Sequence, residues 1–150
     1  MSFPSLVISA DALLPQGAFA EAQAKYLYPD PDAISELEEL LSATNTGIVA
    51  HFYMDVELQG ILSALTWPHV YIADSLMMAD AAVNMAKAGV SQIIVLGVDF
   101  MSENVRAVMD ASGYGSVPVY RVDKREIGCS LAESAEALAY GAWLDKASTS

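Results

Sequence analysis

Short apolar runs alternate along the chain with longer segments in which apolar positions recur every three to four residues. Four runs have the length and composition of buried strands: 48–53, 69–72, 92–97 and 117–122. Helical periodicity predicts helices over residues 33–43, 55–65, 75–88, 102–112 and 130–146. Strands that are apolar on both faces and separated by helices are typical of parallel sheets with helices on both sides. We therefore expect an α/β fold, a three-layer α/β/α sandwich with a four-stranded parallel sheet.

The two ends of this pattern differ. Residues 1–30 contain prolines and no sustained period, so we interpret them as an irregular N-terminal segment. Regular alternation begins near Pro31, which places the folded domain over residues 31–150. In its first helix Ile34, Leu37, Leu40 and Leu41 follow spacings of three, six and seven residues, which we interpret as one buried face.

Composition narrows the class of protein. A chain of 150 residues, 54% hydrophobic and 17% charged, is expected to form a single compact domain and not a disordered segment. Seven Lys and Arg against 19 Asp and Glu give a net charge of −12, which argues against binding to nucleic acids or anionic membranes. The N-terminus resembles neither a secretion signal nor a transit peptide, and no apolar stretch reads as a membrane span. These features predict a cytoplasmic or trimmed polypeptide with small molecules or proteins as partners.

Polar side chains follow the strands at the edge where the carboxyl ends of a parallel sheet meet. Such edges collect ligands in open α/β sheets. His51 interrupts an apolar strand, and burying an imidazole without a partner is costly. It is either a core histidine bonded to a carbonyl or a ligand-binding group, and Tyr53 two residues later, expected on the same strand face, favours the second interpretation.

Helix starts at this edge carry further candidates. Asp74 and Ser75 open a predicted helix, where they can cap free backbone N–H groups, and Ser75 can also hold a carboxylate or phosphate. The two roles are compatible. Ser102 and Glu103 open the next helix, and for them we expect capping or first-turn roles. The loop with Arg121, Lys124 and Arg125 alternates with acidic residues, so we expect it to be solvated.

The cysteine and methionine residues by themselves indicate no specific function. Cys129 is the single cysteine, which excludes an intrachain disulfide and, without context, indicates a small buried residue. The methionines fall mostly on predicted helices and are expected to fill the core. The sequence contains no spacing typical of zinc sites, dinucleotide-binding loops, phosphate-binding loops or serine hydrolases.

Four longer strings are more specific. In chain order they are IVAHFYMDVELQG, IADSLMMADAAVNMAKAG, IIVLGVDFMSENVRAVM and IGCSLAES. Together they resemble the first domain of quinolinate synthase, the iron–sulfur enzyme of de novo NAD biosynthesis. The resemblance covers about residues 6–147. Two stretches, PSLVISADALLPQGAFAEAQAKYLYPD and GVDFMSENVR, resemble the plant and algal enzymes more than the bacterial ones.

The resemblance implies a specific chemistry. In the family that the chain resembles, three related α/β/α domains form a triangle around one 4Fe–4S cluster, and each domain gives one cysteine ligand. In that family iminoaspartate condenses with dihydroxyacetone phosphate to give quinolinate. The resemblance implies that Cys129 is the first cluster cysteine, that His51 and Tyr53 hold substrate and transfer protons, and that Ser75 binds a substrate carboxylate.

Two functions remain open at this point. The chain is a domain of quinolinate synthase that needs the remaining two domains for the cluster, or it is a stand-alone, non-catalytic module that binds a small carboxylate or a protein. In the first case the isolated chain is expected to hold no cluster, because it offers one thiolate. The plant and algal likeness implies the plastid stroma as an alternative to the cytoplasm.

Overall fold

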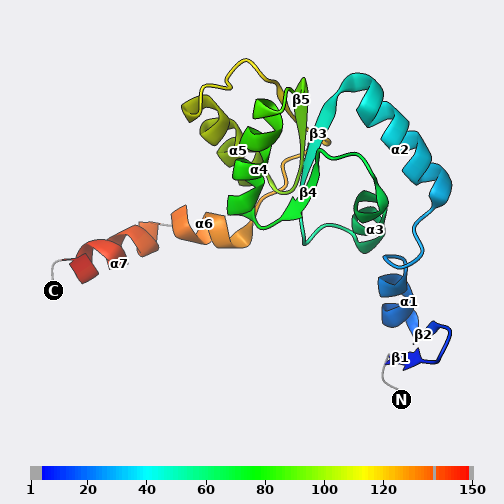
Figure 1. Ribbon diagram of the computed structural model, residues 1–150. Coiled ribbons are helices and arrows are strands. Elements are labelled where there is room, and N and C mark those ends of the chain that lie inside the picture. Colours follow the sequence, from blue (N-terminus) through cyan, green and yellow to red (C-terminus); the bar gives the residue numbers. More distant parts are fainter. Residues whose placement is uncertain (1–4, 137, 149–150) are drawn as a thin grey trace.

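A four-stranded parallel sheet forms the centre of the molecule. The computed structural model describes residues 5–136 and 138–148 (Figure 1). The strands, in the order β4-β3-β5-β6, are β3 (Thr46–His51), β4 (Val70–Ala73), β5 (Gln92–Leu96) and β6 (Val119–Arg121). All neighbouring pairs in this sheet are parallel. The parallel sheet expected from the four apolar runs is confirmed.

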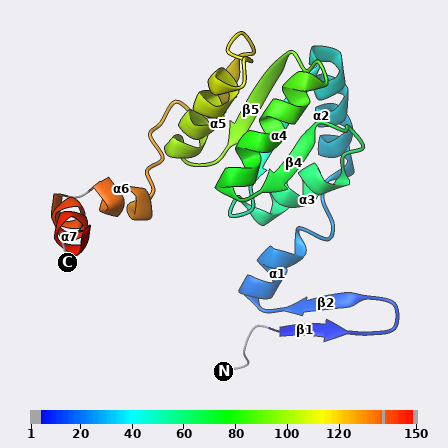
Figure 2. The ribbon, with the colours of Figure 1, turned by 60° about the vertical axis from the view of Figure 1, so that its left-hand side comes forward.

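Helices cover both faces of this sheet (Figures 1 and 2). They are α2 (Pro31–Thr44) and α3 (Val56–Ala64) on one face, and α4 (Ser75–Lys87) and α5 (Asp99–Ala111) on the other. The central strand β3 shows why both faces are apolar. Val49 packs into the core of α4 and α5, whereas Ile48 and Ala50 pack with the core of α2 and α3. The three-layer sandwich is thus confirmed.

One residue of the first predicted helical face is misplaced. Leu41 is buried, but Leu40 is 58% exposed. At about 100° per residue, a position six residues after Ile34 lies about 120° away around the helix. Leu40, six residues after Ile34, therefore does not lie on the helix face that Leu37 and Leu41 share with Ile34.

The helix α5 starts three residues earlier than its sequence predicts. It begins at Asp99 after the N-cap Val98, which makes no capping hydrogen bond with its side chain. Ser102 and Glu103 therefore lie inside the helix, and the hydroxyl of Ser102 donates to the carbonyl of Asp99 at 2.7 Å. The interpretation that they open the helix is wrong. A contact from a distant loop replaces a local cap, because the N–H of Asp99 donates to the carbonyl of Ile127.

The N-terminal segment contains regular structure where an irregular chain was expected. The antiparallel strands β1 (Ser5–Ile8) and β2 (Leu13–Gln16) form a hairpin, and α1 (Ala18–Ala24) follows. These elements lie apart from the central sheet (Figure 2). Pro15 within β2 argues against a strand in the sequence, and the seven residues of α1 are too few for a helical period to be recognised.

This segment is held against α3 by close contacts. Lys25 forms an ion pair with Glu57 at 2.7 Å. A Cβ atom added at Gly60 would lie 2.8 Å from the carbonyl oxygen of Tyr26. The backbone of the segment and helix α3 thus approach each other at a distance that only glycine permits.

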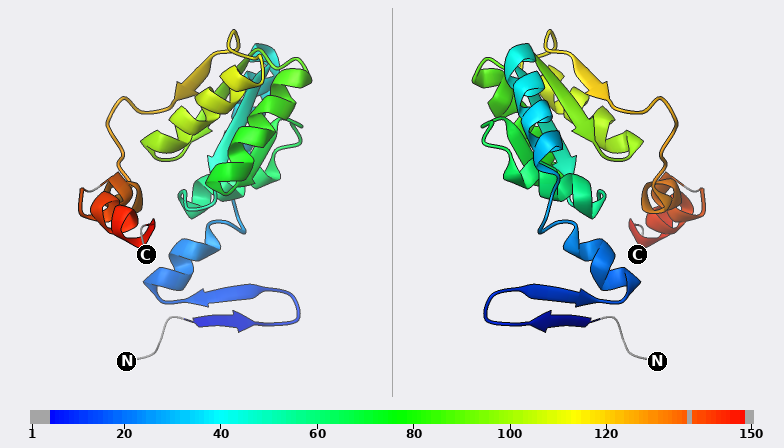
Figure 3. Two further views of the ribbon diagram at one scale, coloured as in Figure 1. Left: turned by 90° about the vertical axis from the view of Figure 1, so that its left-hand side faces the viewer. Right: turned by 90° about the vertical axis from the view of Figure 1, so that its right-hand side faces the viewer.

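The predicted C-terminal helix is divided. The structure has α6 (Ser130–Glu136) and α7 (Leu138–Ser148), and α7 lies apart from the sandwich (Figure 3). Every residue of α7 is exposed, including Leu138 and Trp143. None of the helices over residues 5–136 and 138–148 has both the length and the apolar character needed to cross a membrane.

Candidate functional site

A cavity of about 510 Å³ lies at the carboxyl ends of β3 and β5. It is lined by His51, Tyr53, Met54, Ser75, Gly97, Val98, Phe100, Met101, Cys129, Leu131 and Ala132. In the strand order, the chain runs from β3 to its neighbour β4 in one direction and from β5 to its neighbour β6 in the opposite direction. Connections that diverge from adjacent strands in this way open a crevice at their carboxyl ends.

The cavity brings together the four residues that the sequence singles out. His51, Tyr53, Ser75 and Cys129 all line it, although Cys129 lies 54 residues or more after the others in the sequence. Their roles there stay predictions. The sequence did not single out the apolar part of the lining, which includes Phe100. The signal available for Phe100 was its place four residues after the end of β5, at the edge where ligands bind.

His51 is the last residue of β3 and is 6% exposed. Its Nδ1 atom accepts a hydrogen bond from the backbone N–H of Tyr53 at 3.2 Å, so its partner is an amide and not the carbonyl considered from the sequence. Burial lowers the pKa of His51 below its usual value, and the carboxylate of Asp74 opposes part of this shift. The ring is therefore neutral at pH 7, with its proton on Nε2.

The lowered pKa of His51 predicts a loss of stability in mild acid. The unfolded chain binds a proton at His51 below its unfolded-state pKa of about 6.5, whereas the folded chain binds this proton less readily. The free energy of unfolding therefore decreases as the pH is lowered below this value. Urea titrations between pH 7.5 and pH 5.5 should show a smaller decrease for His51→Gln than for the wild-type chain. Equal slopes for His51→Gln and wild type would contradict this prediction.

Tyr53 reaches the cavity from a turn and not from the strand. The strand β3 ends at His51, so the expected alternation of side chains does not extend to Tyr53. The side chain is 82% exposed, and its ring meets those of His51 and Phe52 edge-on with centroids 4.6 Å apart. The ring cluster holds the phenol at the rim of the cavity.

Ser75 is the first residue of α4, and Asp74 caps this helix. One carboxylate oxygen of Asp74 accepts from the backbone N–H groups of Leu76 and Met77, both at 2.9 Å. Of the two residues considered for the cap, Asp74 thus performs it. Ser75 lines the cavity at the positive end of the helix dipole, where a carboxylate is stabilised.

Loss of this cap should destabilise the fold without removing a cavity-lining side chain. We expect Asp74→Ala to lower the free energy of unfolding by about 1 kcal/mol, because two backbone N–H groups lose their acceptor. Asp74→Asn keeps a capping oxygen and should lose less. Chemical denaturation of the three proteins measures the difference, and equal midpoints would show that the cap contributes nothing.

The thiol of Cys129 is chemically suited to be one of several ligands of an iron–sulfur cluster. Its thiol is free, half-buried and part of the cavity wall. Within residues 5–136 and 138–148, no three His, Cys, Asp or Glu side chains form a group able to hold a metal ion. A 4Fe–4S cluster with one open iron needs three thiolates. This chain can therefore supply one of them.

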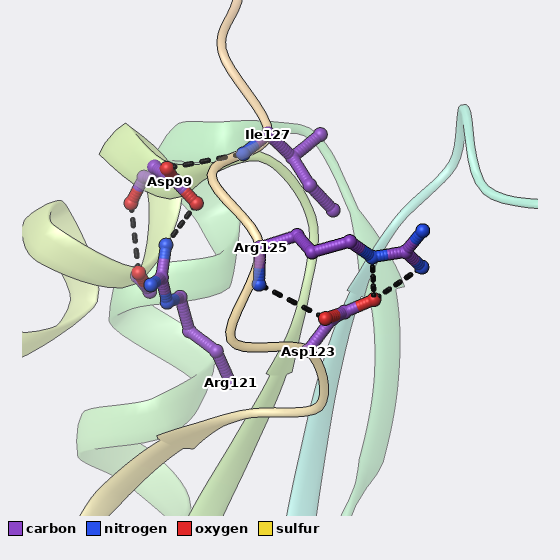
Figure 4. Close-up of polar contacts among 6 residues, drawn as sticks. Asp99, Arg121, Asp123, Arg125 and Ile127 are labelled. Atoms are coloured by element: carbon purple, nitrogen blue, oxygen red, sulfur yellow. Dashed lines mark hydrogen bonds and ion pairs between the residues drawn. The ribbon is translucent and has the colours of Figure 1, made fainter.

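The basic loop before Cys129 is more ordered than its composition predicts. Arg121 pairs with Asp99, and Arg125 pairs with Asp123 (Figure 4). The expectation of a solvated loop is confirmed, because Arg121, Lys124 and Arg125 are all exposed. Arg121 in addition binds Asp99, which belongs to α5.

Comparisons with known proteins reveal close relatives. A family model described as Quinolinate synthetase A protein matches residues 35–149. Quinolinate synthase, chloroplastic, of Nicotiana tabacum is 58% identical over 150 residues, and the protein of the same name from Arabidopsis thaliana is 55% identical. Each alignment covers 99% of this chain and 21% of the relative, so the chain spans about a fifth of their length.

A more distant relative comes from a cyanobacterium. Quinolinate synthase of Prochlorococcus marinus (strain MIT 9313) is 30% identical over 131 residues, which is 85% of this chain and 34% of the relative. No solved structure matches the chain significantly.

Proposed function

The chain belongs to the quinolinate synthetase A family, and from this premise we propose that it is the N-terminal domain of a quinolinate synthase that acts in NAD biosynthesis. In this proposal the whole protein condenses iminoaspartate with dihydroxyacetone phosphate to quinolinate, with loss of phosphate and two water molecules. The observation that carries the proposal is the cavity lined by His51, Tyr53, Ser75 and Cys129.

Each lining residue has a chemical task in this reaction. Ser75, at the start of α4, donates its hydroxyl hydrogen to a carboxylate of iminoaspartate, and the helix dipole adds to the attraction. Tyr53 serves as the acid/base group for proton transfers during enolisation and dehydration. Its exposure at the cavity rim supports contact with substrate.

His51 serves as a fixed donor. Because its Nδ1 atom accepts from the backbone of Tyr53, its Nε2–H is available to a substrate oxygen. Burial keeps the ring neutral, and it also holds the ring beside Tyr53. A neutral imidazole in a fixed orientation suits the binding of a carbonyl or hydroxyl oxygen.

Cys129 would hold the cluster together with two cysteines from the other domains. When bound, the cluster supplies a Lewis acid that polarises substrate oxygens. Phe100, Met101 and Leu131 form an apolar part of the lining, and a neighbouring domain that covers them would exclude water, which strengthens polar interactions with the substrate.

The remaining two domains are the proposed partners of this one. Helices α6 and α7 carry the exposed apolar side chains Leu131, Leu138 and Trp143, which would be buried against a neighbouring domain. The plastid stroma is the proposed location, supported by plant relatives whose names describe them as chloroplastic.

The test is an anaerobic assay of the full-length protein that contains this chain. Purified and reconstituted, it should bind about four irons and form quinolinate from the two substrates. A folded full-length protein without iron and without product would favour the non-catalytic carboxylate-binding module instead.

Ser75→Ala tests the binding role within that assay. Loss of a hydrogen bond to a charged group costs about 1.5 to 3 kcal/mol, so KM for iminoaspartate should rise about tenfold or more while kcat changes little. Ser35→Ala, near the start of α2 and away from the cavity, is the control. An unchanged KM would remove Ser75 from the binding site.

A further inference from the structure

The loop that leads to Cys129 is tied back to the start of α5. The backbone N–H of Asp99 donates to the carbonyl of Ile127 at 3.0 Å, and the backbone N–H of Ile127 donates to Oδ2 of Asp99 at 3.1 Å. Ile127 lies two residues before Cys129. This reciprocal pair of hydrogen bonds fixes the backbone immediately before the cysteine.

The same carboxylate also holds the other end of the loop. Oδ1 of Asp99 accepts a hydrogen bond from Nη1 of Arg121, the last residue of β6 (Figure 4). One side chain therefore binds both the start and the end of residues 121–127. The side chain of Asp99 is only 24% exposed, and shielding from water strengthens charge-assisted hydrogen bonds.

A second ion pair in this loop is local. Arg125 donates to Asp123 through its backbone N–H at 2.9 Å and its Nε at 2.8 Å, so both partners belong to the same short turn. This pair shapes the turn but does not connect it to α5. It provides a comparison for the Asp99 contacts.

Asp99 and Cys129 also line one small cavity. It has a volume of about 160 Å³, Phe100 and Ile127 belong to its lining, and it shares Phe100 and Cys129 with the candidate site. Phe100, the residue after Asp99, lines the candidate site as well. The start of α5 thus connects the wall of the candidate site to the loop that carries Cys129.

We propose that Asp99 is a positioning residue that holds the Cys129 thiol at the candidate site by binding Arg121 and the backbone of Ile127 at once. The part of this inference that concerns a cluster rests on the proposed function. The part that concerns the loop rests on the hydrogen bonds alone. Residues that orient metal ligands from outside typically change metal affinity or activity by about 10- to 100-fold when they are replaced.

The first measurement is the rate of alkylation of Cys129 in the full-length apoprotein, followed by mass spectrometry of the peptide that contains it. We expect Asp99→Asn to raise this rate about tenfold, because the loss of the carboxylate increases the population of the open loop. Asp123→Asn and Asp110→Asn are matched controls. The first breaks the local pair, and the second breaks an ion pair with Arg106 elsewhere on α5. Both should label at the wild-type rate.

Variants of Arg121 separate positioning from folding. Arg121→Gln leaves the Asp99 carboxylate on Ile127 and should raise the labelling rate less than Asp99→Asn, and Arg121→Lys should restore most of the protection. Circular dichroism melts identify any variant that has lost its fold. The exchange Asp99→Arg with Arg121→Asp should fail to restore protection, because the N–H of Ile127 would lose its acceptor.

The second measurement is the rate at which iron is lost to a chelator after anaerobic reconstitution, together with the electron paramagnetic resonance signal of the reduced protein. Asp99→Asn should lose iron about tenfold faster, with a changed signal. Wild-type labelling in folded Asp99→Asn and Arg121→Gln would overturn the proposal. If the wild-type protein binds no iron, the proposed function fails, and the labelling rates still decide whether Asp99 positions Cys129.

Discussion

Replacing Tyr53 by Phe in the full-length protein is expected to lower kcat by about 10²- to 10⁴-fold. The change removes the hydroxyl and keeps the ring, so the edge-on contacts with His51 and Phe52 remain. Because the ring is 82% exposed, the hydroxyl is expected to add little to the stability of the fold. Steady-state assays with saturating substrates measure the loss, and iron analysis shows whether the cluster remains.

Tyr71→Phe is the matched control for this experiment. Tyr71 is an exposed tyrosine on β4 that does not line the candidate site, so its variant should retain wild-type kcat. Near wild-type turnover of Tyr53→Phe, with iron bound, would exclude Tyr53 as the acid/base group. A parallel loss of iron and activity would instead assign Tyr53 a structural role at the cavity rim.

Cys129→Ser is expected to abolish both the cluster and the activity of the full-length protein. A cluster with one open iron has three thiolate ligands, and the removal of one should lower bound iron to about a tenth of wild type or less. The fold should survive, because Cys129 is only half-buried and forms no disulfide. Iron analysis after anaerobic reconstitution, with a thermal melt of the same sample, tests both statements.

Ser134→Ala, an exposed position on α6, controls for changes on that helix and should keep its iron. The isolated 150-residue chain is expected to bind no stoichiometric cluster, since it offers a single thiolate. About four irons per monomeric chain would contradict the division of cluster ligands among three domains. About four irons per trimer would indicate a symmetric cluster between three copies of Cys129.

Some local features were decided by contacts that no local pattern encodes. The start of α5 was expected at Ser102 but lies at Asp99, because the carbonyl of Ile127, from a loop more than 20 residues away, accepts its first N–H. The hairpin and α1 were missed because Pro15 argues against a strand at β2, because α1 has only seven residues, and because contacts of the segment with α3 help to hold it.

The candidate site was predicted in its members but not in its geometry. The positions of His51 and Ser75 at strand and helix ends follow from the alternation of apolar runs and helices, because parallel strands bring their carboxyl ends to one edge. Cys129 follows the last strand, so the same rule also predicts its loop at this edge, but the rule does not predict the path of residues 122–128 between them. Its place in the cavity depends on the loop after β6, and Arg121 and Ile127 at the two ends of that loop bind Asp99.

Local sequence patterns were sufficient to predict the layers of this protein, the order of its central strands and helices along the chain, and a helix cap at Asp74 or Ser75, because apolar periodicity and capping depend on residues close together in the chain. The folded structure was needed to establish the strand order, the exposure of Tyr53, the choice of Asp74 as the cap, and the cavity in which Cys129 meets His51. Each of these depends on which distant segments pack together and exclude water, and a local sequence pattern does not specify distant packing partners.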